Sequence, residues 1–268
     1  MLLAHEFDNA SLNRALEAFL GMAHDLLGDQ LVSVLLHGSV VFDDLAPGYG
    51  DLDFVAIVAG ELSEGMCRRL VDLRRPLRGG DWGPFGKMLE GAFLPRHLLD
   101  PNQTGSAFWW GTTGERAWQG NRLGWFCLHG LRTAGIVIFG EDVRAEIPPA
   151  SRESLLADAW ADCQNIKQHG RGGTLHSVDW LLQAARVLFW LKEGELISKS
   201  RAADWGLDHA KGQWSELLPQ AKEIRRHPQR PESPEVKRWL DGLTEPIQEA
   251  SQELEQELLA LGFRPPAA

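Results

Sequence analysis

The first part of the chain places apolar residues first at helical and then at extended spacing. Leucine and alanine recur every three or four positions over 11–27, and Gly28 follows as a stop, which predicts a helix. Two short apolar runs rich in branched residues, at 31–37 and 53–60, are bounded by Gly and Pro. Such runs are typical of strands buried on both faces, so a sheet is expected here.

The next segments continue this mixed pattern. An amphipathic helix is predicted from Ser63, and a third strand at 86–95. Residues 100–122 are rich in Gly, Thr and Trp and show no period, so we interpret them as a loop on the substrate side. A helix at 123–135 and a short strand at 136–140 complete this half.

Helical periodicity dominates after "EIPPASRESL", where Pro148 and Pro149 interrupt the chain and Ser151 can cap a helix. We expect five helices, at 151–168, 175–193, 199–210, 214–226 and 234–261. The sequence therefore predicts an α/β (α+β) domain with a mixed sheet over 1–147 and an all-α helical bundle over 148–268.

Composition narrows the class of protein. The chain has 268 residues, 44% of them hydrophobic, which suffices for two domains with their own cores. Lys and Arg number 27 against 37 Asp and Glu, and the net charge of −10 disfavours nucleic acid and favours cationic partners. Its three cysteines have neither disulfide-framework nor zinc-site spacing, which fits a cytoplasmic protein. No signal peptide or membrane-spanning run is recognised, so no membrane partner is expected.

The chemistry concentrates in "LLHGSVVFDDLAPGYGDLDFVAIV", residues 35–58. On a strand, Asp51 and Asp53 point to the same side, while the residues between and after them pack on the other. Two adjacent carboxylates are costly without a cation, and Mg²⁺ prefers a few carboxylates together with phosphate oxygens. The alternative is a pair of solvated turn residues, which is how we interpret Asp43 and Asp44 in the preceding loop.

Three further residues add to this pattern. Gly38 and Ser39 follow the first strand at a turn, where backbone amides and a hydroxyl can bind phosphate. Glu90 lies in an otherwise apolar strand and could be a third metal ligand, a general base or an exposed edge residue. The sequence lacks the arrangements expected of a hydrolase triad or a zinc enzyme. The acid-rich tail "EPIQEASQELEQELLALG" is interpreted as a solvated helix face.

The stretch 35–58, followed by "MLEGAFLP", resembles the nucleotidyltransferases of the DNA polymerase β superfamily, whose signature is Gly-Ser, a loop, Asp-x-Asp and a later acid. The later stretch "LLQAARVLFWLKEGELISKSRAADWGLDHA" is similar to the second domain of the aminoglycoside (spectinomycin/streptomycin) adenylyltransferases. The resemblance implies an antibiotic-resistance enzyme that transfers AMP from ATP to a drug hydroxyl, with Mg²⁺.

The resemblance also implies residue roles. Gly38 and Ser39 would hold the nucleotide phosphates, Asp51 and Asp53 would bind Mg²⁺, and Glu90 would deprotonate the acceptor hydroxyl. In the helical domain Arg186 and Lys199 would reach the ATP phosphates, one as a bidentate and one as a point-like cation; without the resemblance they would be a surface helix charge and a cap-region lysine. We expect a monomer with a cationic small-molecule substrate.

Several positions depart from the family pattern. Gly50 stands where relatives usually have Ser, which removes one phosphate hydrogen bond. The acid used for streptomycin recognition is replaced by His176, with Asp179 one turn later. An expected aspartate at 121–124 is absent, and Arg225 lies near the expected place of an adenine-side Tyr.

The acceptor is the least determined part of this prediction. Trp109, Trp110 and Trp118 lie where such enzymes place an aromatic side chain against the drug, and one of them is expected to stack on a polycationic sugar. Two alternatives stay open: the same chemistry on another small molecule or a protein, and a non-catalytic antitoxin or binding protein of the same fold.

Overall fold

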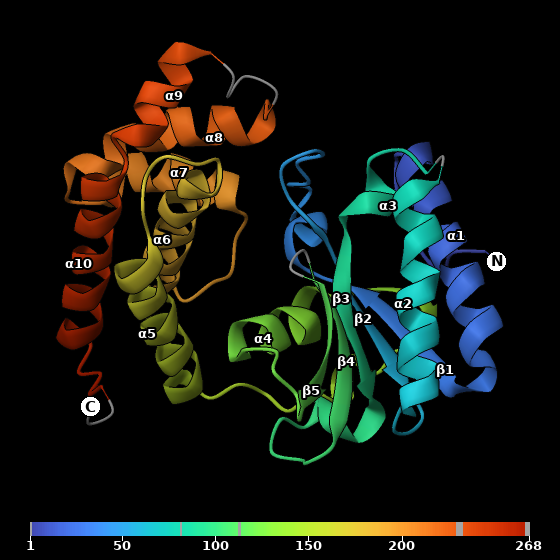
Figure 1. Ribbon diagram of the computed structural model, residues 1–268. Coiled ribbons are helices and arrows are strands. Elements are labelled where there is room, and N and C mark those ends of the chain that lie inside the picture. Colours follow the sequence, from blue (N-terminus) through green and yellow to red (C-terminus); the bar gives the residue numbers. More distant parts are fainter. Residues whose placement is uncertain (1, 81, 112–113, 229–232, 266–268) are drawn as a thin grey trace. The chain divides into compact units, whose positions relative to one another are not determined.

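A mixed sheet of six strands, in the order β5-β4-β3-β2-β1-β6, forms the centre of the first of two units (Figure 1). β2 and β3 run parallel, joined by a helical crossover, and the other neighbouring strands run antiparallel. The strands are β1 Leu31–Leu36, β2 Leu52–Val58, β3 Leu89–Pro95, β4 Ser106–Gly111, β5 Gly114–Gln119 and β6 Ile136–Gly140. The computed structural model describes residues 2–80, 82–111, 114–228 and 233–265.

Helices cover both faces of this sheet (Figure 1). They are α1 Ala10–Leu27, α2 Glu64–Gly79, α3 Phe85–Met88 and α4 Trp125–Ala134. On one face Phe19 of α1 packs against Phe54 and Trp110, with ring centroids 4.7 and 5.9 Å apart. On the other face Leu128 of α4 packs in a cluster with Val55 and residues of β1 and β3. Because side chains alternate between the two faces along each strand, a residue's position in its strand decides whether it shares a face with the site.

The predicted loop at 100–122 is wrong, because it contains the antiparallel pair β4 and β5. β5 lies at the edge of the sheet, and most of its side chains are exposed or half-buried. Such a strand carries no alternating apolar pattern, so periodicity could not reveal it.

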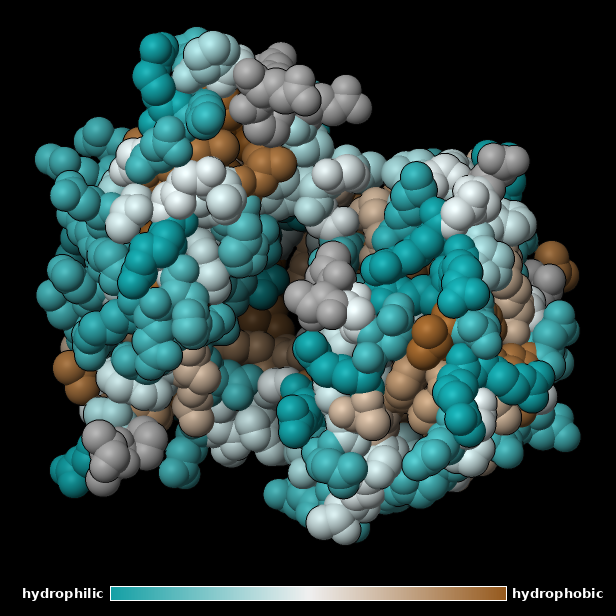
Figure 2. Space-filling view, viewed as in Figure 1, coloured by the Kyte–Doolittle hydropathy of each residue, from teal (hydrophilic) through white to brown (hydrophobic). Residues whose placement is uncertain are grey.

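The second unit is a bundle of helices around α6 His176–Glu193, most of whose apolar side chains are buried. The surrounding helices are α5 Arg152–His169, α7 Lys199–His209, α8 Leu218–Arg226, α9 Pro234–Asp241 and α10 Thr244–Ala260. The visible face of this unit is mostly hydrophilic, in keeping with the acidic composition (Figure 2). Within the described residues, no helix is long and apolar enough to cross a membrane.

Two expectations for the last part of the chain need correction. The single helix predicted at 234–261 is two helices. α9 ends at Asp241, and the N–H of the next residue, Gly242, donates to the Arg238 carbonyl. The acid-rich tail is not wholly solvated: Glu253 accepts one hydrogen bond from the Trp214 indole, at 2.9 Å, and Glu257 pairs with lysines of two other segments.

The division into units also differs from the predicted domains. The first unit comprises Met1–Val41 and Gly50–Ala150, and the second Phe42–Tyr49 and Ser151–Ala268. The loop between the Gly-Ser turn and Asp51 is therefore grouped with the helical unit, although the sequence places it in the N-terminal domain.

Candidate active site

Asp53 and Glu90 lie opposite each other on the adjacent parallel strands β2 and β3. Neighbouring strands are about 4.8 Å apart, so the two side chains extend from backbone positions that are close together. Both side chains are half-buried. Val55 and Ala92, two positions further on, pack in the cluster beneath α4, so Asp53 and Glu90 project on that same face.

The turn after β1 meets Asp53. Gly38 begins a 3-10 turn, Gly38–Phe42, with φ +69°, and a Cβ placed on it would lie 2.9 Å from Asp53 Cγ and nearer still to Oδ2. The His37 N–H also donates to the Asp53 carbonyl, at 3.1 Å. A glycine here lets the backbone approach the carboxylate, and half-buried Ser39 follows in the same turn. The first unit thus brings together the predicted phosphate turn and the acids.

The acids suit a divalent cation held by two carboxylates. Asp51 immediately precedes β2, two residues from Asp53, and both are half-buried. Among the described residues no group of three or more His, Cys, Asp or Glu is placed to hold a metal. Glu90 as a third ligand therefore stays a prediction. A pair of carboxylates still fits Mg²⁺, which completes its shell with water and phosphate oxygens.

His37 is a neighbour of this site that the sequence did not single out. Burial lowers the pKa of His37 to about 4, so the imidazole is neutral near pH 7. Its Nδ1 lies 3.6 Å from the Cys127 thiol of α4. This histidine adds no positive charge beside Gly38, and only its position directly before the Gly-Ser turn could have drawn attention to it.

The three candidate tryptophans separate into different environments. Trp110 is fully buried among Phe19, Phe54 and other aromatic rings on the α1 face, so its prediction as an acceptor contact is wrong. Trp109 stacks on Trp118, with centroids 4.6 Å apart and planes 13° apart, and Trp118 is itself buried.

Trp109 is the most exposed of the three tryptophans. It is half-buried and pairs with Ala92 across the strands, which puts it on the face of Glu90. Its indole lies against Gly111, where a Cβ would come 3.0 Å from Cδ1 of the ring. A side chain at that position would push the ring away, so the glycine at 111 leaves room for the Trp109 indole.

In the helical unit three of the predicted residues come together. Lys199 Nζ lies 2.6 Å from Asp179 Oδ1, and His176 Nδ1 lies 3.8 Å from the other carboxylate oxygen. Burial raises the pKa of Asp179, but hydrogen bonds from His176, Lys199 and Tyr49 and the charge of Lys199 lower it more, well below its ordinary value. Asp179 is therefore ionised and engaged with Lys199.

Arg186 lies on the same helix, and a half-buried acid lies within reach of the charges of Arg186 and Lys199. Asp162 of α5 accepts a hydrogen bond from Gln183, at 2.7 Å. Burial raises its pKa, against the charges of Arg186 and Lys199. Asp162 was not recognised from the sequence, although it lies on α5 directly beside the buried Cys163.

Asp44 is not a solvated turn residue, which corrects its interpretation from sequence. Its Oδ1 lies 3.1 Å from Arg225 Nη1, and the side chains are 10% and 4% exposed. Arg225, expected near the adenine, is thus half of a buried ion pair within the helical unit. Asp43 is exposed, as expected.

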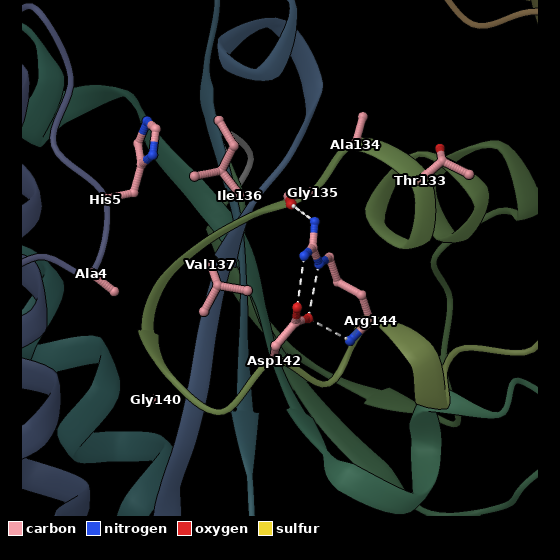
Figure 3. A pocket seen from close by; sticks show the side chains of 10 residues that line it. All are labelled: Ala4, His5, Thr133, Ala134, Gly135, Ile136, Val137, Gly140, Asp142 and Arg144. Carbon is pink, nitrogen blue, oxygen red and sulfur yellow. Dashed lines mark hydrogen bonds and ion pairs between the residues drawn. The ribbon is translucent and has the colours of Figure 1, made fainter.

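A separate cavity of about 520 Å³ lies beside β6 and contains none of the predicted site residues (Figure 3). Its cation, Arg144, donates to both oxygens of Asp142, at 2.8 and 2.6 Å, and to the Gly135 carbonyl at 3.1 Å. The cation is therefore already neutralised, and the cavity offers no chemistry comparable to the acids on β2 and β3.

The first unit therefore combines a mixed sheet with a Gly-Ser turn and two acids on adjacent parallel strands, and the second unit is helical. Residues 146–250 match the family described as "Aminoglycoside adenylyltransferase, C-terminal domain". The fold is similar to a crystal structure of the spectinomycin adenyltransferase AAD(9) from Enterococcus faecialis with ATP and spectinomycin.

That structural similarity has a TM-score of 0.69 and covers 90% of this chain and 98% of the other. At 16% identity it shows the shared fold alone. The comparison with curated proteins gives no match. The fold class expected from the sequence, an α/β domain with a mixed sheet followed by a helical one, is confirmed.

Proposed function

We propose that the protein transfers AMP from ATP to a hydroxyl of an aminoglycoside antibiotic of the streptomycin or spectinomycin type, and so confers resistance. The observation that carries this proposal is the match of residues 146–250 to the aminoglycoside adenylyltransferase C-terminal domain. The arrangement of Gly38, Asp53 and Glu90 supports it, because nucleotidyl transfer needs a phosphate turn, a cation seat and a base within one small region.

In the proposed reaction the drug hydroxyl attacks the α-phosphorus of ATP. An oxygen–phosphorus bond forms to the drug, the bond to the bridging oxygen breaks, and pyrophosphate leaves. Glu90 accepts the hydroxyl proton, and Ser39 with the turn backbone binds phosphate oxygens. Asp51 and Asp53 would hold Mg²⁺, which when bound supplies positive charge against the developing charge on the phosphates. The assignment of Arg186 and Lys199 to the ATP phosphates stays part of this proposal.

Trp109 is proposed to bind the drug. A half-buried indole held in a rigid stack on Trp118 can pack against a sugar ring or its ammonium groups at low entropic cost. The face it shares with Glu90 supports this role.

Of the two drugs, we expect spectinomycin to be the better acceptor. His176 stands where the resemblance predicts the acid that recognises streptomycin, and the nearby carboxylate of Asp179 is engaged by Lys199 at 2.6 Å. A more highly charged drug would then lack its counter-charge. Its binding would be weaker, because burying an unpaired cation is costly. The same change makes a different small-molecule acceptor the second candidate.

The test uses purified protein with Mg²⁺ and ATP and measures pyrophosphate release with spectinomycin, streptomycin and a non-antibiotic amino sugar. We expect drug-dependent release that Asp53→Ala abolishes, with a higher kcat/KM for spectinomycin. ATP binding without turnover of either drug would favour another acceptor, and absence of ATP binding would favour a non-catalytic role.

A further inference from the structure

The loop Phe42–Tyr49 connects the Gly-Ser turn to Asp51 and is grouped with the helical unit. Asp44 and Tyr49 each fasten this loop. Both contacts lie within that unit, and neither Asp44 nor Tyr49 itself takes part in the proposed chemistry.

The first contact, which we name the Asp44 clasp, consists of Asp44, Arg225 and the Ser200 amide. Arg225 donates from Nη2 to the Asp44 carbonyl at 2.6 Å, while its Nη1 lies 3.1 Å from the carboxylate. The Ser200 N–H, in the first turn of α7, donates to Asp44 Oδ2 at 3.2 Å. One guanidinium thus binds both the backbone and the side chain of Asp44, and a helix N-terminus binds the remaining oxygen.

The second contact is Tyr49, the single tyrosine of the chain. Its hydroxyl donates to the Leu175 carbonyl at 3.1 Å and lies beside the Asp179 carboxylate. Asp179 in turn holds Lys199 at 2.6 Å.

Asp51 follows this fastened loop closely. Two peptide units separate it from Tyr49, which limits the Cα–Cα separation to about 7 Å. Fixing both Asp44 and Tyr49 removes most of the freedom of the chain leading into β2. The position of Asp51 then depends on the contacts that hold Asp44 and Tyr49.

We propose that Asp44 and Arg225 are positioning residues of the adenylyl transfer: the clasp fixes the loop that leads to Asp51, and so limits the positions that this proposed cation ligand can take. This inference rests on the proposed function. Substitution of a residue that supports a metal ligand without touching the metal typically lowers metal affinity or activity by about 10- to 100-fold.

The test compares Asp44→Asn with Glu257→Gln. Both substitutions turn a carboxylate into an amide in the helical unit, at side chains 10% and 11% exposed, but Glu257 pairs with Lys192 and Lys211, neither of which belongs to the loop. We expect Asp44→Asn to lower kcat and raise the Mg²⁺ concentration for half-maximal rate by about tenfold each, with the drug KM within about threefold. Glu257→Gln should leave these quantities near wild type.

The Mg²⁺ dependence separates positioning from simple loss of folded protein, because a smaller active fraction lowers kcat and leaves half-saturation unchanged. Fluorotyrosine incorporation gives one ¹⁹F resonance, from Tyr49, which should shift in Asp44→Asn. A shifted resonance together with kinetic constants equal to those of Glu257→Gln would overturn the proposal.

Two further variants cover a failure of Asp44→Asn to fold. Arg225→Lys keeps the charge and one contact and should be intermediate, and Tyr49→Phe removes only the hydroxyl. If wild type turns over no drug, Mg²⁺-dependent ATP binding, measured by calorimetry, tests the role of the Asp44 clasp instead. In that case the proposed function fails, while a tenfold weaker Mg²⁺-ATP affinity in Asp44→Asn alone still supports the clasp, and equal affinities refute it.

Discussion

Substituting Gly38 by alanine should damage the reaction far more than the fold. The new Cβ would lie 2.9 Å from Asp53 Cγ, against about 3.5 Å for an unstrained contact between carbons, so the carboxylate must retreat by at least about 0.6 Å. A displacement near 1 Å in a catalytic group costs about 100-fold in rate. We therefore expect kcat for pyrophosphate release to fall by roughly 10- to 100-fold.

Alanine at φ +69° also strains the backbone, by roughly 1–2 kcal/mol. Gly120→Ala is the matched control: its φ is +71°, it lies in the same unit, and a Cβ there meets nothing within 4 Å. Both variants should lose similar free energy of unfolding in urea, but only Gly38→Ala should lose activity. If both retain activity within about fivefold of wild type, Asp53 does not need the position that the structure gives it.

Three other predictions test the base, the core and the helical unit. Glu90→Gln should lower kcat by about 10²- to 10⁴-fold with ATP affinity unchanged by calorimetry, and a loss under tenfold would remove Glu90 as the base. Arg74→Met removes a buried guanidinium that lies 2.8 Å from Glu115 and should destabilise the first unit by on the order of 3 kcal/mol in urea; a loss below about 1 kcal/mol would contradict this. Hydrogen bonds from two lysines lower the pKa of Glu257, so its stabilisation is present at neutral pH and is lost as pH falls below its ordinary value near 4.5. Glu257→Gln should therefore be less stable than wild type at pH 7 but nearly equal at pH 3, and the same gap at both pH values would refute the assignment.

Local pattern determined what the sequence could predict. The helix at 11–27 has its own cap and stop, and it appears as α1, with the Asn9 side chain accepting from two amides and Gly28 at its end. The strands carrying Asp53 and Glu90 were likewise recognisable from their apolar runs. β5 was not, because an exposed edge strand has no periodic apolar face.

The candidate site was predictable in part for the same reason. Its acids and glycine lie on recognisable strands and turns, whereas the buried role of Asp44 depends on Arg225, which is 181 positions away. Glu253 likewise meets its indole partner only after the bundle folds. Nothing local distinguishes such acids from solvated ones, so their partners could not be inferred from spacing.

The measurement that tests the central claim most directly is mass spectrometry of the drug after incubation with the protein, Mg²⁺ and ATP. We predict that spectinomycin gains one adenylyl group with wild type and none with Asp53→Ala. Consumption of ATP, or binding of it, with every tested aminoglycoside left unmodified would contradict the account.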